Sequence, residues 1–253
     1  MRILATAATT LFIGWLATAT YAADNSAAPQ TMNYTIAALG DSLGDGLWEG
    51  LYRALLKDKR SSVQRIAKRS VGFARSNLIA QIDAALAKGP VQAFTMVIGV
   101  NDDDNSFFVN GRPVALFGTE EWKRLYAERV GAFMDRLGQT GSPVIWLLLP
   151  AMRQPSADRA AQLVNEIYTQ AARERPFIHL VTTRKATGDE QGNYVAYLKD
   201  AAGHTRLLRH ADGVHFQDAG YLLLAKIVVE RLKEVSPEFR TATDVGNASQ
   251  VGP

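Results

Sequence analysis

The sequence contains no cysteine among its 253 residues. This absence excludes disulfide bonds, thiolate metal sites, a cysteine nucleophile and a lipid-modified cysteine. An excess of one charge sign is also missing, because 28 Lys and Arg residues stand against 25 Asp and Glu residues and leave a formal charge of +3. A chain so evenly charged lacks the basic surface that phosphate backbones require, and we expect no nucleic-acid partner.

Long hydrophobic runs are lacking except at the N-terminus. There, a positive charge at Arg2 precedes an uncharged, largely apolar run that ends at Leu16. Small residues follow, and the candidate cleavage sites lie after Ala19, Ala22 and Ala23. This pattern is typical of a cleaved secretory signal peptide, which we predict over residues 1–22. An uncleaved membrane anchor is the alternative, because the run and its small residues together are about long enough to span a bilayer.

The signal peptide predicts a periplasmic or secreted protein with no stable membrane insertion after cleavage. The rest of the chain divides into a polar lead-in over residues 23–33, a folded domain over residues 34–234 and a flexible C-terminal tail over residues 235–253. No internal repeat or long linker indicates a second domain, and no pattern indicates an oligomeric state.

Short apolar runs alternate with longer segments of helical period along the folded part. The runs, rich in β-branched and aromatic residues, are 34–38, 63–67, 94–100, 144–149 and 177–181. The segments with apolar residues three and four positions apart are 47–57, 78–88, 120–137, 157–173 and 219–234. This alternation is typical of parallel strands buried between helices. It predicts the α/β class, as a single three-layer α/β/α domain with a five-stranded parallel sheet of flavodoxin-like type.

Two polar insertions interrupt the alternation. Residues 102–118 contain a turn signal at Asn110-Gly111, and residues 182–212 contain turn signals at Gly188 and Gly203. Both insertions follow predicted strands. Because open α/β sheets bind their ligands beyond the carboxyl ends of the strands, these ends are where we look for chemistry.

A serine and a histidine occupy such positions at opposite ends of the domain. Ser42 follows the first predicted strand, where a hydroxyl is exposed near the free N–H groups of the next helix. Asp212 precedes His215 by three residues, and a carboxylate at this spacing can orient an imidazole. Taken alone, Ser42 is more typical of a helix N-cap than of a nucleophile. The pair together indicates a serine nucleophile with a base, since a serine hydroxyl needs one.

The sequence resembles the SGNH, or GDSL, hydrolase family over residues 34 to 234. The nucleophile block is matched by Gly40-Asp41-Ser42-Leu43, the asparagine block by Gly99-Val100-Asn101-Asp102, and the histidine block by Asp212-Gly213-Val214-His215. The glycine block is Ser70-Val71-Gly72, where many members carry Asn-x-Gly, and Gly72 is assigned by its position. The signal peptide and the Gly-Asp-Gly-Leu-Trp segment after the serine resemble a secreted proteobacterial branch of the family.

The resemblance implies hydrolysis of an acyl ester without a cofactor. Ser42 would attack the carbonyl, His215 would move the proton, and Asp212 would hold the imidazole. The backbone N–H groups of Ser42 and Gly72 and the side-chain amide of Asn101 would form the oxyanion hole. Glycine allows close approach of backbone, and an amide is a neutral donor, which suits both residues to this role.

The expected substrate is an O-acylated glycan or a small ester with a short acyl group. Residues 182–212 carry five Lys and Arg residues beside scattered apolar ones, and no contiguous apolar lid would line a trough for a long acyl chain. Phe107 and Phe108 in the other insertion offer either a modest acyl pocket or loop packing. An O-acyltransferase acting on envelope polysaccharide and a non-catalytic glycan-binding protein are the alternatives, and intact catalytic motifs disfavour the latter.

Several other residues have competing interpretations. Arg75 and Arg153 fall at the catalytic edge, where they would bind substrate or form surface salt bridges. Asp41 and Asp102 are expected to brace their loops. His179, inside the fifth run, is expected in the sheet. We predict no metal, because His204, His210 and His215 lack the spacing of a ligand pair on one helix face and residues 102–105 do not begin an EF-hand loop.

Overall fold

The computed structural model describes residues 33–103, 105–200 and 202–240. The predicted signal peptide, nearly all of the predicted lead-in and the tail beyond residue 240 lie outside the described residues. Among the helices of the described part, none combines the length and the apolar character that a bilayer crossing requires.

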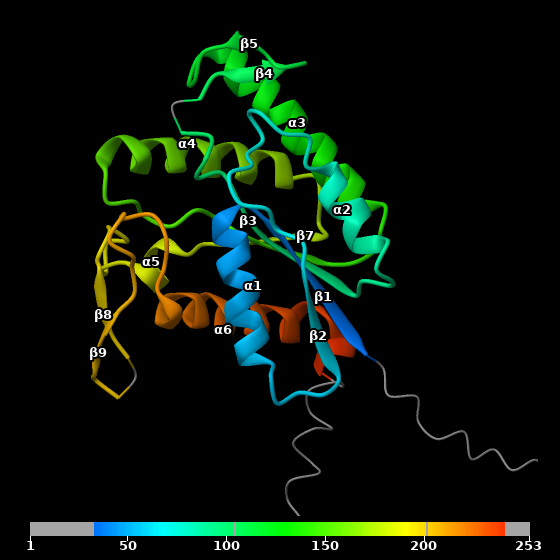
Figure 1. Cartoon of the computed structure of the whole chain (residues 1–253), viewed down its shortest axis with the longest axis vertical. Coiled ribbons are helices and arrows are strands. Elements are labelled where there is room, and N and C mark those ends of the chain that lie inside the picture. Colours follow the sequence, from blue (N-terminus) through cyan, green and yellow to red (C-terminus); the bar gives the residue numbers. More distant parts are fainter. Residues whose placement is uncertain (1–32, 104, 201, 241–253) are drawn as a thin grey trace, which may run out of the picture. The chain divides into compact units, whose positions relative to one another are not determined.

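The centre of the fold is a parallel sheet of five strands. They are β1 (Tyr34–Gly40), β2 (Ser61–Arg65), β3 (Ala93–Val97), β6 (Val144–Leu147) and β7 (Ile178–Val181). The order across the sheet is β2-β1-β3-β6-β7, with every neighbouring pair parallel (Figure 1). Each strand overlaps one of the five predicted runs, with β2 beginning two residues earlier and β3 ending three residues earlier than predicted, and the order is that of flavodoxin-like folds. From β1 the chain goes first to β2 on one side of the sheet and then to β3 on the other, so the strand order reverses between β1 and β3. Such folds bind their ligands at the point of this reversal.

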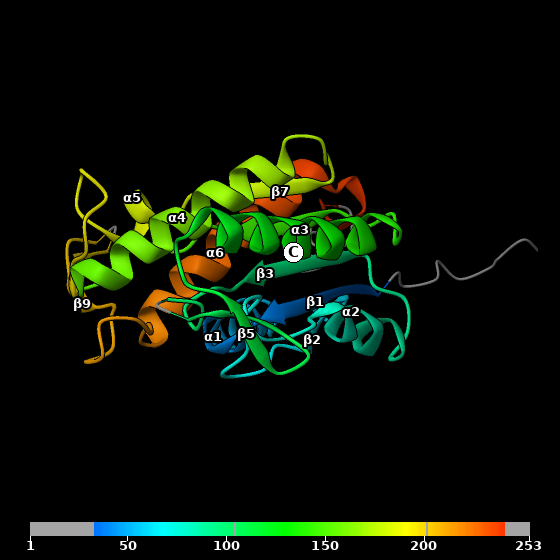
Figure 2. The same ribbon diagram turned by 90° about the horizontal axis from the view of Figure 1, so that it is seen from above.

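Helices cover both faces of the sheet. They are α1 (Ser42–Ala54), α2 (Ile79–Leu86), α3 (Glu120–Gly138), α4 (Pro155–Ala172) and α6 (Asp218–Val235). Helix α1 packs against α6, and α3 packs against both α2 and α4. Figure 2 looks down on the strands with α3 and α4 above them, and Figure 1 places α6 on the other side of the sheet. The predicted three-layer α/β/α domain is confirmed.

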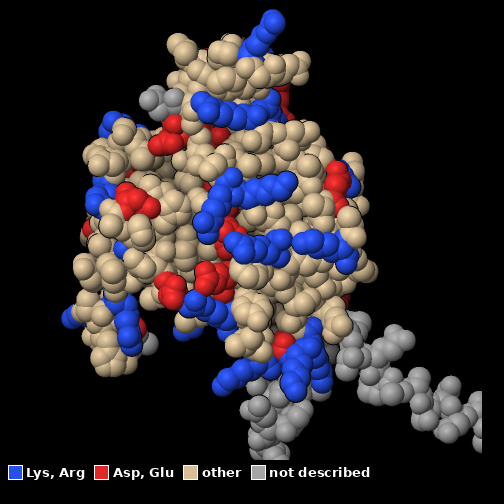
Figure 3. Space-filling model, in the orientation of Figure 1, with Lys and Arg blue, Asp and Glu red and all other residues tan. Residues whose placement is uncertain are grey.

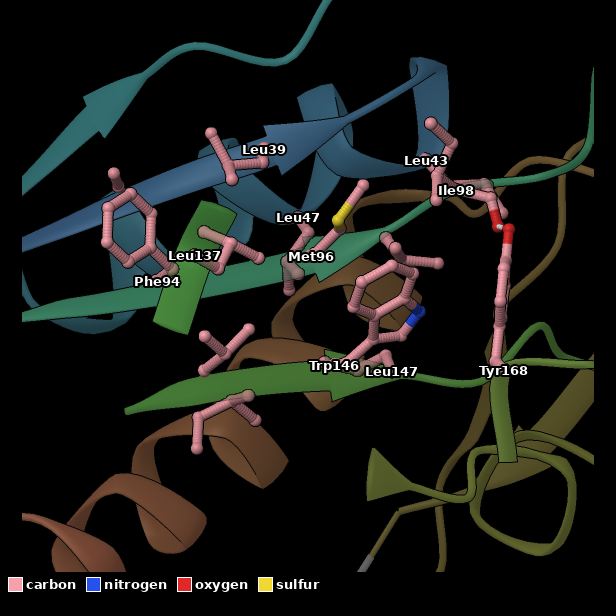
Figure 4. Close-up of a cluster of buried hydrophobic side chains, with 14 of the residues drawn as sticks. Leu39, Leu43, Leu47, Phe94, Met96, Ile98, Leu137, Trp146, Leu147 and Tyr168 are labelled. Carbon is pink, nitrogen blue, oxygen red and sulfur yellow. Dashed lines mark hydrogen bonds between the residues drawn. The ribbon is translucent and has the colours of Figure 1, made fainter. Parts of the chain in front are cut away.

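Apolar side chains from all three layers form one core. Figure 4 shows Leu39 of β1, Met96 of β3 and Trp146 of β6 pointing into it beside residues of α1 and α3. Trp146 is fully buried and lies 4.9 Å from the ring of Tyr168, measured between centroids. This continuous packing fixes the strand ends, and therefore the loops that carry polar side chains, relative to one another.

Helix α1 begins five residues earlier than the periodicity predicts. Its first residue is Ser42, and the Asp41 carboxylate caps it by accepting the Leu43 N–H at 2.9 Å. The glycines in its first turns lower helix propensity and hide the start of the helix. Gly44 allows α1 to lie close to β1, because a Cβ on this residue would lie 2.3 Å from the Leu39 carbonyl oxygen.

The two insertions form small hairpins rather than irregular loops. Strands β4 (Phe107–Val109) and β5 (Arg112–Ala115) pair across a turn in which Asn110 and Gly111 have φ of 50° and 76°, at the predicted turn position. The second insertion contains a short helix, α5 (Arg184–Thr187), and the pair β8 (Tyr197–Lys199) and β9 (Thr205–Leu207). Three-residue strands are too short to predict from alternation.

The start of the predicted flexible tail is packed in the structure. Ser236 accepts a hydrogen bond from the Tyr34 hydroxyl at 2.8 Å, and the Phe239 ring, fully buried, meets the Tyr34 ring edge-on at 5.0 Å. The expectation that the chain loosens from residue 235 is therefore wrong for residues 236–240. One aromatic side chain in a polar segment is enough to anchor it, because burial of a phenyl ring contributes about 2 kcal/mol.

Candidate active site

Ser42, His215 and Asp212 form a continuous chain of hydrogen bonds. The Ser42 Oγ lies 2.7 Å from the His215 Nε2, and the His215 Nδ1 lies 2.8 Å from the Asp212 Oδ2. These distances allow the serine proton to pass to the imidazole while the carboxylate holds the other ring nitrogen. The structure thus brings Ser42 together with His215, 173 residues later in the sequence, and with Asp212, three residues before His215.

Two helices that pack closely against each other, α1 and α6, position the serine and the histidine of this chain of hydrogen bonds. Ser42 is the first residue of α1, and His215 lies in the loop that leads into α6. Gly46 and Gly50 of α1 face Tyr221 of α6, where added Cβ atoms would lie 2.0 Å from the Tyr221 ring and 2.4 Å from its carbonyl oxygen. The glycines therefore set the short distance between the helices that brings serine and histidine into contact.

The loop from Asp212 to His215 is ordered by its own carboxylate. The Asp212 Oδ1 accepts the backbone N–H of Val214 at 2.8 Å and that of His215 at 2.9 Å. Partial burial alone would raise the pKa of Asp212, but these two bonds and the contact with the His215 imidazole outweigh it and hold the pKa below 3.8. The carboxylate is therefore ionised at neutral pH and can stabilise an imidazolium.

A buried arginine supports the same loop from beneath, and sequence reasoning did not single it out for this role. Arg209 is 1% exposed and its guanidinium lies 4.9 Å and 4.2 Å from the ring centres of Tyr194 and Phe216. Its Nη2 donates to the carbonyl oxygens of Gly213 at 3.2 Å and Val214 at 2.8 Å. Burial lowers the pKa of Arg209 to about 10, so the group stays charged at neutral pH.

His210 lies near the same carboxylate but occupies a different position. Its Nδ1 is 3.3 Å from the Asp212 Oδ2, and its side chain is 56% exposed. Within the described residues, no hydrogen bond connects it to Ser42, whereas His215 has one. The geometry favours His215 as the base.

Asn101 lines the cleft with Ser42, and Gly72, which is not part of that lining, lies on the loop that Asn101 contacts. The Asn101 side-chain amide donates to the Val71 carbonyl oxygen at 2.9 Å, which ties the two loops together and leaves the second amide N–H for a ligand. A Cβ on Gly72 would lie 2.1 Å from the Asp102 Oδ1, so only glycine fits there. The Ser42 N–H, at the first helical position, has no partner within the helix.

The carboxylates of Asp41 and Asp102 brace these loops, as expected. Asp41 accepts the Gly99 N–H at 2.9 Å and the Val100 N–H at 3.2 Å in addition to capping α1. Asp102 accepts two backbone N–H groups of the glycine-block loop, each at 2.9 Å, and the hydroxyl of Tyr126 at 2.7 Å. Burial raises the pKa of Asp41 to about 7 and that of Asp102 to about 6, against the effect of these bonds.

The serine and histidine open into a cleft of about 670 Å³. Charged and polar side chains dominate its lining: Ser42, Asp45, Gly46, Trp48, Glu49, Arg65, Arg69, Ser70, Asn101, His210, Asp212, His215 and Tyr221. Figure 3 shows Lys and Arg side chains crossing the middle of one face of the molecule beside Asp and Glu side chains. A larger hollow of about 810 Å³ between α3 and α4 contains none of Ser42, Asp212 and His215 in its lining. The smaller cleft is therefore the candidate substrate-binding site.

The structure does not place the two predicted substrate-binding arginines in this lining. Arg75 lies over the Phe108 ring at 4.8 Å. Arg153 donates to the carbonyl oxygens of His210 and Ala211 and so binds the protein's own loop. Arg65 and Arg69 line the cleft instead, and sequence reasoning missed them. Their position at and after the carboxyl end of β2, beside β1, was the available signal.

The remaining histidines do not gather around a common point. His179 lies in β7, as expected, and burial lowers its pKa. His204 lies between β8 and β9, with its Nδ1 3.6 Å from the Asp200 carboxylate. In residues 33–103, 105–200 and 202–240, no three His, Asp or Glu side chains are close enough together to hold a metal ion.

Comparisons with known proteins agree with this fold. The sequence model of a family described as "Protein of unknown function (DUF459)" matches residues 35–231. No curated protein matches the sequence. Solved structures that share the fold include a lipase/acylhydrolase from Enterococcus faecalis, with a TM-score of 0.56 and 15% identity over 79% of this chain and 96% of that one.

Two further structures are similar to the same extent. A catalytic mutant of an acetylxylan esterase from Geobacillus stearothermophilus has a TM-score of 0.55 and 16% identity over 80% of this chain and 94% of its own. A member of the lipolytic G-D-S-L family from Veillonella parvula has a TM-score of 0.52 and 17% identity over 78% and 97%. The chain therefore belongs to the DUF459 family, and its fold is that of the SGNH, or GDSL, hydrolases.

Proposed function

We propose that this protein is a serine esterase of the periplasm or the exterior that removes short acyl groups from an O-acylated envelope glycan or a related ester. The observation that carries the proposal is the hydrogen-bonded chain from Ser42 through His215 to Asp212, with the serine open to a cleft. The similarity of the fold to an acetylxylan esterase structure supports it further.

The geometry supports acyl transfer through the serine. The Ser42 Oγ attacks the ester carbonyl carbon while the His215 Nε2 accepts its proton, and the Asp212 carboxylate stabilises the imidazolium. The Ser42 and Gly72 N–H groups and the Asn101 amide donate to the carbonyl oxygen as it becomes negative. The alcohol leaves with the proton from His215. Water then repeats the sequence on the acyl-serine, releases the acid and restores the enzyme.

The composition of the cleft supports a short acyl group. A long acyl chain needs an apolar trough, worth about 0.8 kcal/mol for each buried CH₂ group. The lining next to the serine contains Trp48 and Tyr221 among mostly charged and polar side chains. Phe107, a candidate for an acyl pocket, is 2% exposed and packs under the Arg129 guanidinium at 3.9 Å. That position favours loop packing over substrate binding.

Hydrolysis of p-nitrophenyl esters from acetyl to decanoyl tests the proposal. We expect kcat/KM to be highest at about two to four carbons and the Ser42→Ala protein to lose turnover. Ser62→Ala, which changes an exposed serine of β2, is the matched control and should behave as wild type. A maximum at about eight carbons or beyond would point to a lipid substrate. Release of free acid in the absence of a sugar acceptor would indicate hydrolysis, whereas turnover only in the presence of an acceptor would indicate transfer between sugars.

A further inference from the structure

Two arginines share one carboxylate beside the serine. Asp45 lies one turn beyond Ser42 in α1 and is 6% exposed. Its Oδ1 accepts the Arg65 Nε at 2.6 Å, and its Oδ2 accepts the Arg65 Nη2 at 2.9 Å and the Arg69 Nε at 3.0 Å. All three residues line the cleft. One carboxylate therefore anchors two cations at the mouth of the candidate active site.

Arg65 alone is sufficient to neutralise Asp45. It contacts both carboxylate oxygens, and its guanidinium also lies 4.8 Å from the ring centre of Trp48. The Trp48 indole is fixed in turn by donating to the Val63 carbonyl oxygen at 3.1 Å. Hydrogen bonding from Arg65 is the largest cause that holds the pKa of Asp45 below 3.8. A buried carboxylate needs one such partner, and the second arginine requires another explanation.

Arg69 has binding capacity that its contact with Asp45 does not use. Its side chain is 75% exposed, and only its Nε–H is bonded within the described residues, although a guanidinium has five N–H donors. The other carboxylates of the cleft have partners of their own. Glu49 lies 2.6 Å from Arg53, and Asp212 contacts the imidazole of His215. Arg53 is itself shared between Glu49 and Asp218. Arg69 therefore adds a second cation to Asp45, with its terminal N–H groups available to a ligand.

Building on the proposed esterase function, we propose that the substrate is acidic and that Arg69, supported by Arg65, binds a carboxylate on the sugar whose hydroxyl is acylated. A guanidinium fork matches a carboxylate with two parallel hydrogen bonds. Residues three apart in a helix have Cβ atoms about 5–6 Å from each other, so the cation anchored on Asp45 lies near the serine. The bound anion is thus close to the reacting ester, and the ester is one carried by a uronic acid or a similar acidic sugar.

A pair of substrates that differ only in charge tests this inference. We would use O-acetylated methyl galacturonoside and O-acetylated methyl galactoside, which carry a carboxylate and a hydroxymethyl group at the same carbon. The wild type should prefer the acid in kcat/KM by about tenfold or more, the size expected for charge-assisted hydrogen bonds. Arg69→Gln should reduce this ratio to near one, mainly through KM, and Arg69→Lys should retain part of it.

The matched control is Arg206→Gln. Arg206 also donates its Nε to one carboxylate, that of Asp200 at 2.9 Å, and is 57% exposed, but it lies in β9 and outside the lining of the cleft. This variant should keep the wild-type ratio. Equal kcat/KM for the two esters in the wild type would overturn the inference while leaving the esterase proposal intact.

Binding without turnover separates failure of the inference from failure of the esterase function. The Ser42→Ala protein would be titrated with galacturonate and with galactose, and the arginine Nε–H signals would be followed by NMR. We expect shifts with galacturonate alone, lost when Arg69→Gln is added. Responses that are equal for the two sugars, or unchanged by Arg69→Gln, would overturn the inference whether or not the protein hydrolyses esters.

Discussion

At the scale of single residues, we propose that the Ser42 hydroxyl and the His215 imidazole, which lie 2.7 Å apart, act as one catalytic unit. We expect Ser42→Ala and His215→Ala each to lower kcat for p-nitrophenyl acetate by about a million-fold, and the double variant to be scarcely worse. Asp212→Asn should cost roughly ten-thousand-fold. Melting temperatures near that of the wild type would show that the fold is retained. Turnover near wild type in either single variant, or a larger loss from His210→Ala, would contradict the assignment.

Asn101 is expected to act on the transition state more than on the substrate. Its amide would donate to the carbonyl oxygen as that atom gains charge, so Asn101→Ala should lower kcat by about a hundred- to a thousand-fold with little change in KM. Steady-state kinetics on a short ester separate the two constants. If KM alone changes, the residue binds substrate and is not part of an oxyanion hole.

We propose that Arg209 positions the loop that carries His215, because it contacts the carbonyl groups of Gly213 and Val214 and not the serine. Arg209→Met should lower kcat by roughly a hundred-fold, since a small displacement of His215 is enough for that loss, while KM stays close to wild type. Arg209→Lys restores the charge but not the fork and should be intermediate. A fall in melting temperature with unchanged kcat would make Arg209 purely structural.

The residues that could be predicted from sequence are those with a motif, and the others depend on packing. Ser42, Asn101 and His215 sit in short blocks whose spacing is set by the strand ends. Arg65 and Arg69 reach the cleft because Asp45 turns their guanidinium groups toward it. No local sequence pattern encodes these contacts. Asp45 lies in α1, whereas Arg65 ends β2, 20 residues later, and Arg69 lies in the following loop, 24 residues later.

At the scale of helices and strands, we expect the contact between α1 and α6 to affect both the proposed catalysis and the stability of the fold. A Cβ on Gly50 would lie 2.4 Å from the Tyr221 carbonyl oxygen, a backbone atom that cannot move without shifting α6. Gly50→Ala should therefore lower the free energy of unfolding by about 1–3 kcal/mol and also lower kcat. Calorimetry and steady-state kinetics on the same sample test both effects.

Gly131→Ala is the matched control for this prediction. Gly131 is also within a helix, α3, and the nearest atom to its added Cβ is the end of the Arg175 side chain at 3.4 Å. This variant should be neutral or more stable by up to about 1 kcal/mol, because alanine favours the helix. Equal destabilisation by both substitutions would mean that glycine at position 50 has no special role in helix contact.

Periodicity predicted the strands and longer helices well and their irregular ends poorly. Four of the five sheet strands are largely apolar because helices cover both faces of the sheet, whereas the edge strand β2 is mostly polar. The early start of α1 was missed because glycines that serve the contacts with β1 and α6 weaken the helical pattern. In the same way, the hairpins of the two insertions depend on pairing between three- and four-residue strands, which leave little periodic signal.

At the scale of the whole molecule, the buried carboxylates predict how stability depends on pH. The folded protein holds a proton on Asp41 up to about pH 7, whereas the unfolded chain releases it near the ordinary pKa of 3.8. Between these values the folded state binds more protons, so the free energy of unfolding falls as pH rises, by at most about 1.4 kcal/mol per pH unit for this group. Asp102 adds a similar slope up to about pH 6.

Asp41→Asn tests this dependence, because an amide has no proton to release in this range. Melting temperature measured from about pH 4 to pH 7 should fall less steeply in the variant than in the wild type. Asp212 acts in the opposite direction and at lower pH, since its folded pKa lies below 3.8 and its contribution is lost as pH falls. An unchanged slope in Asp41→Asn would show that Asp41 is ionised in the folded protein throughout the range.

The contact between α1 and α6 also determines when, during synthesis of the chain, the proposed activity can appear. Because His215 comes 173 residues after Ser42, a growing chain presents Ser42 long before the proposed base has been made. Closing a loop of this length costs chain entropy, and the contact between Ser42 and His215 exists only once α6 packs against α1. Under the proposed mechanism, Ser42 therefore stays inert in every chain that lacks His215, and a protease that removes α6 would abolish the activity without touching the serine.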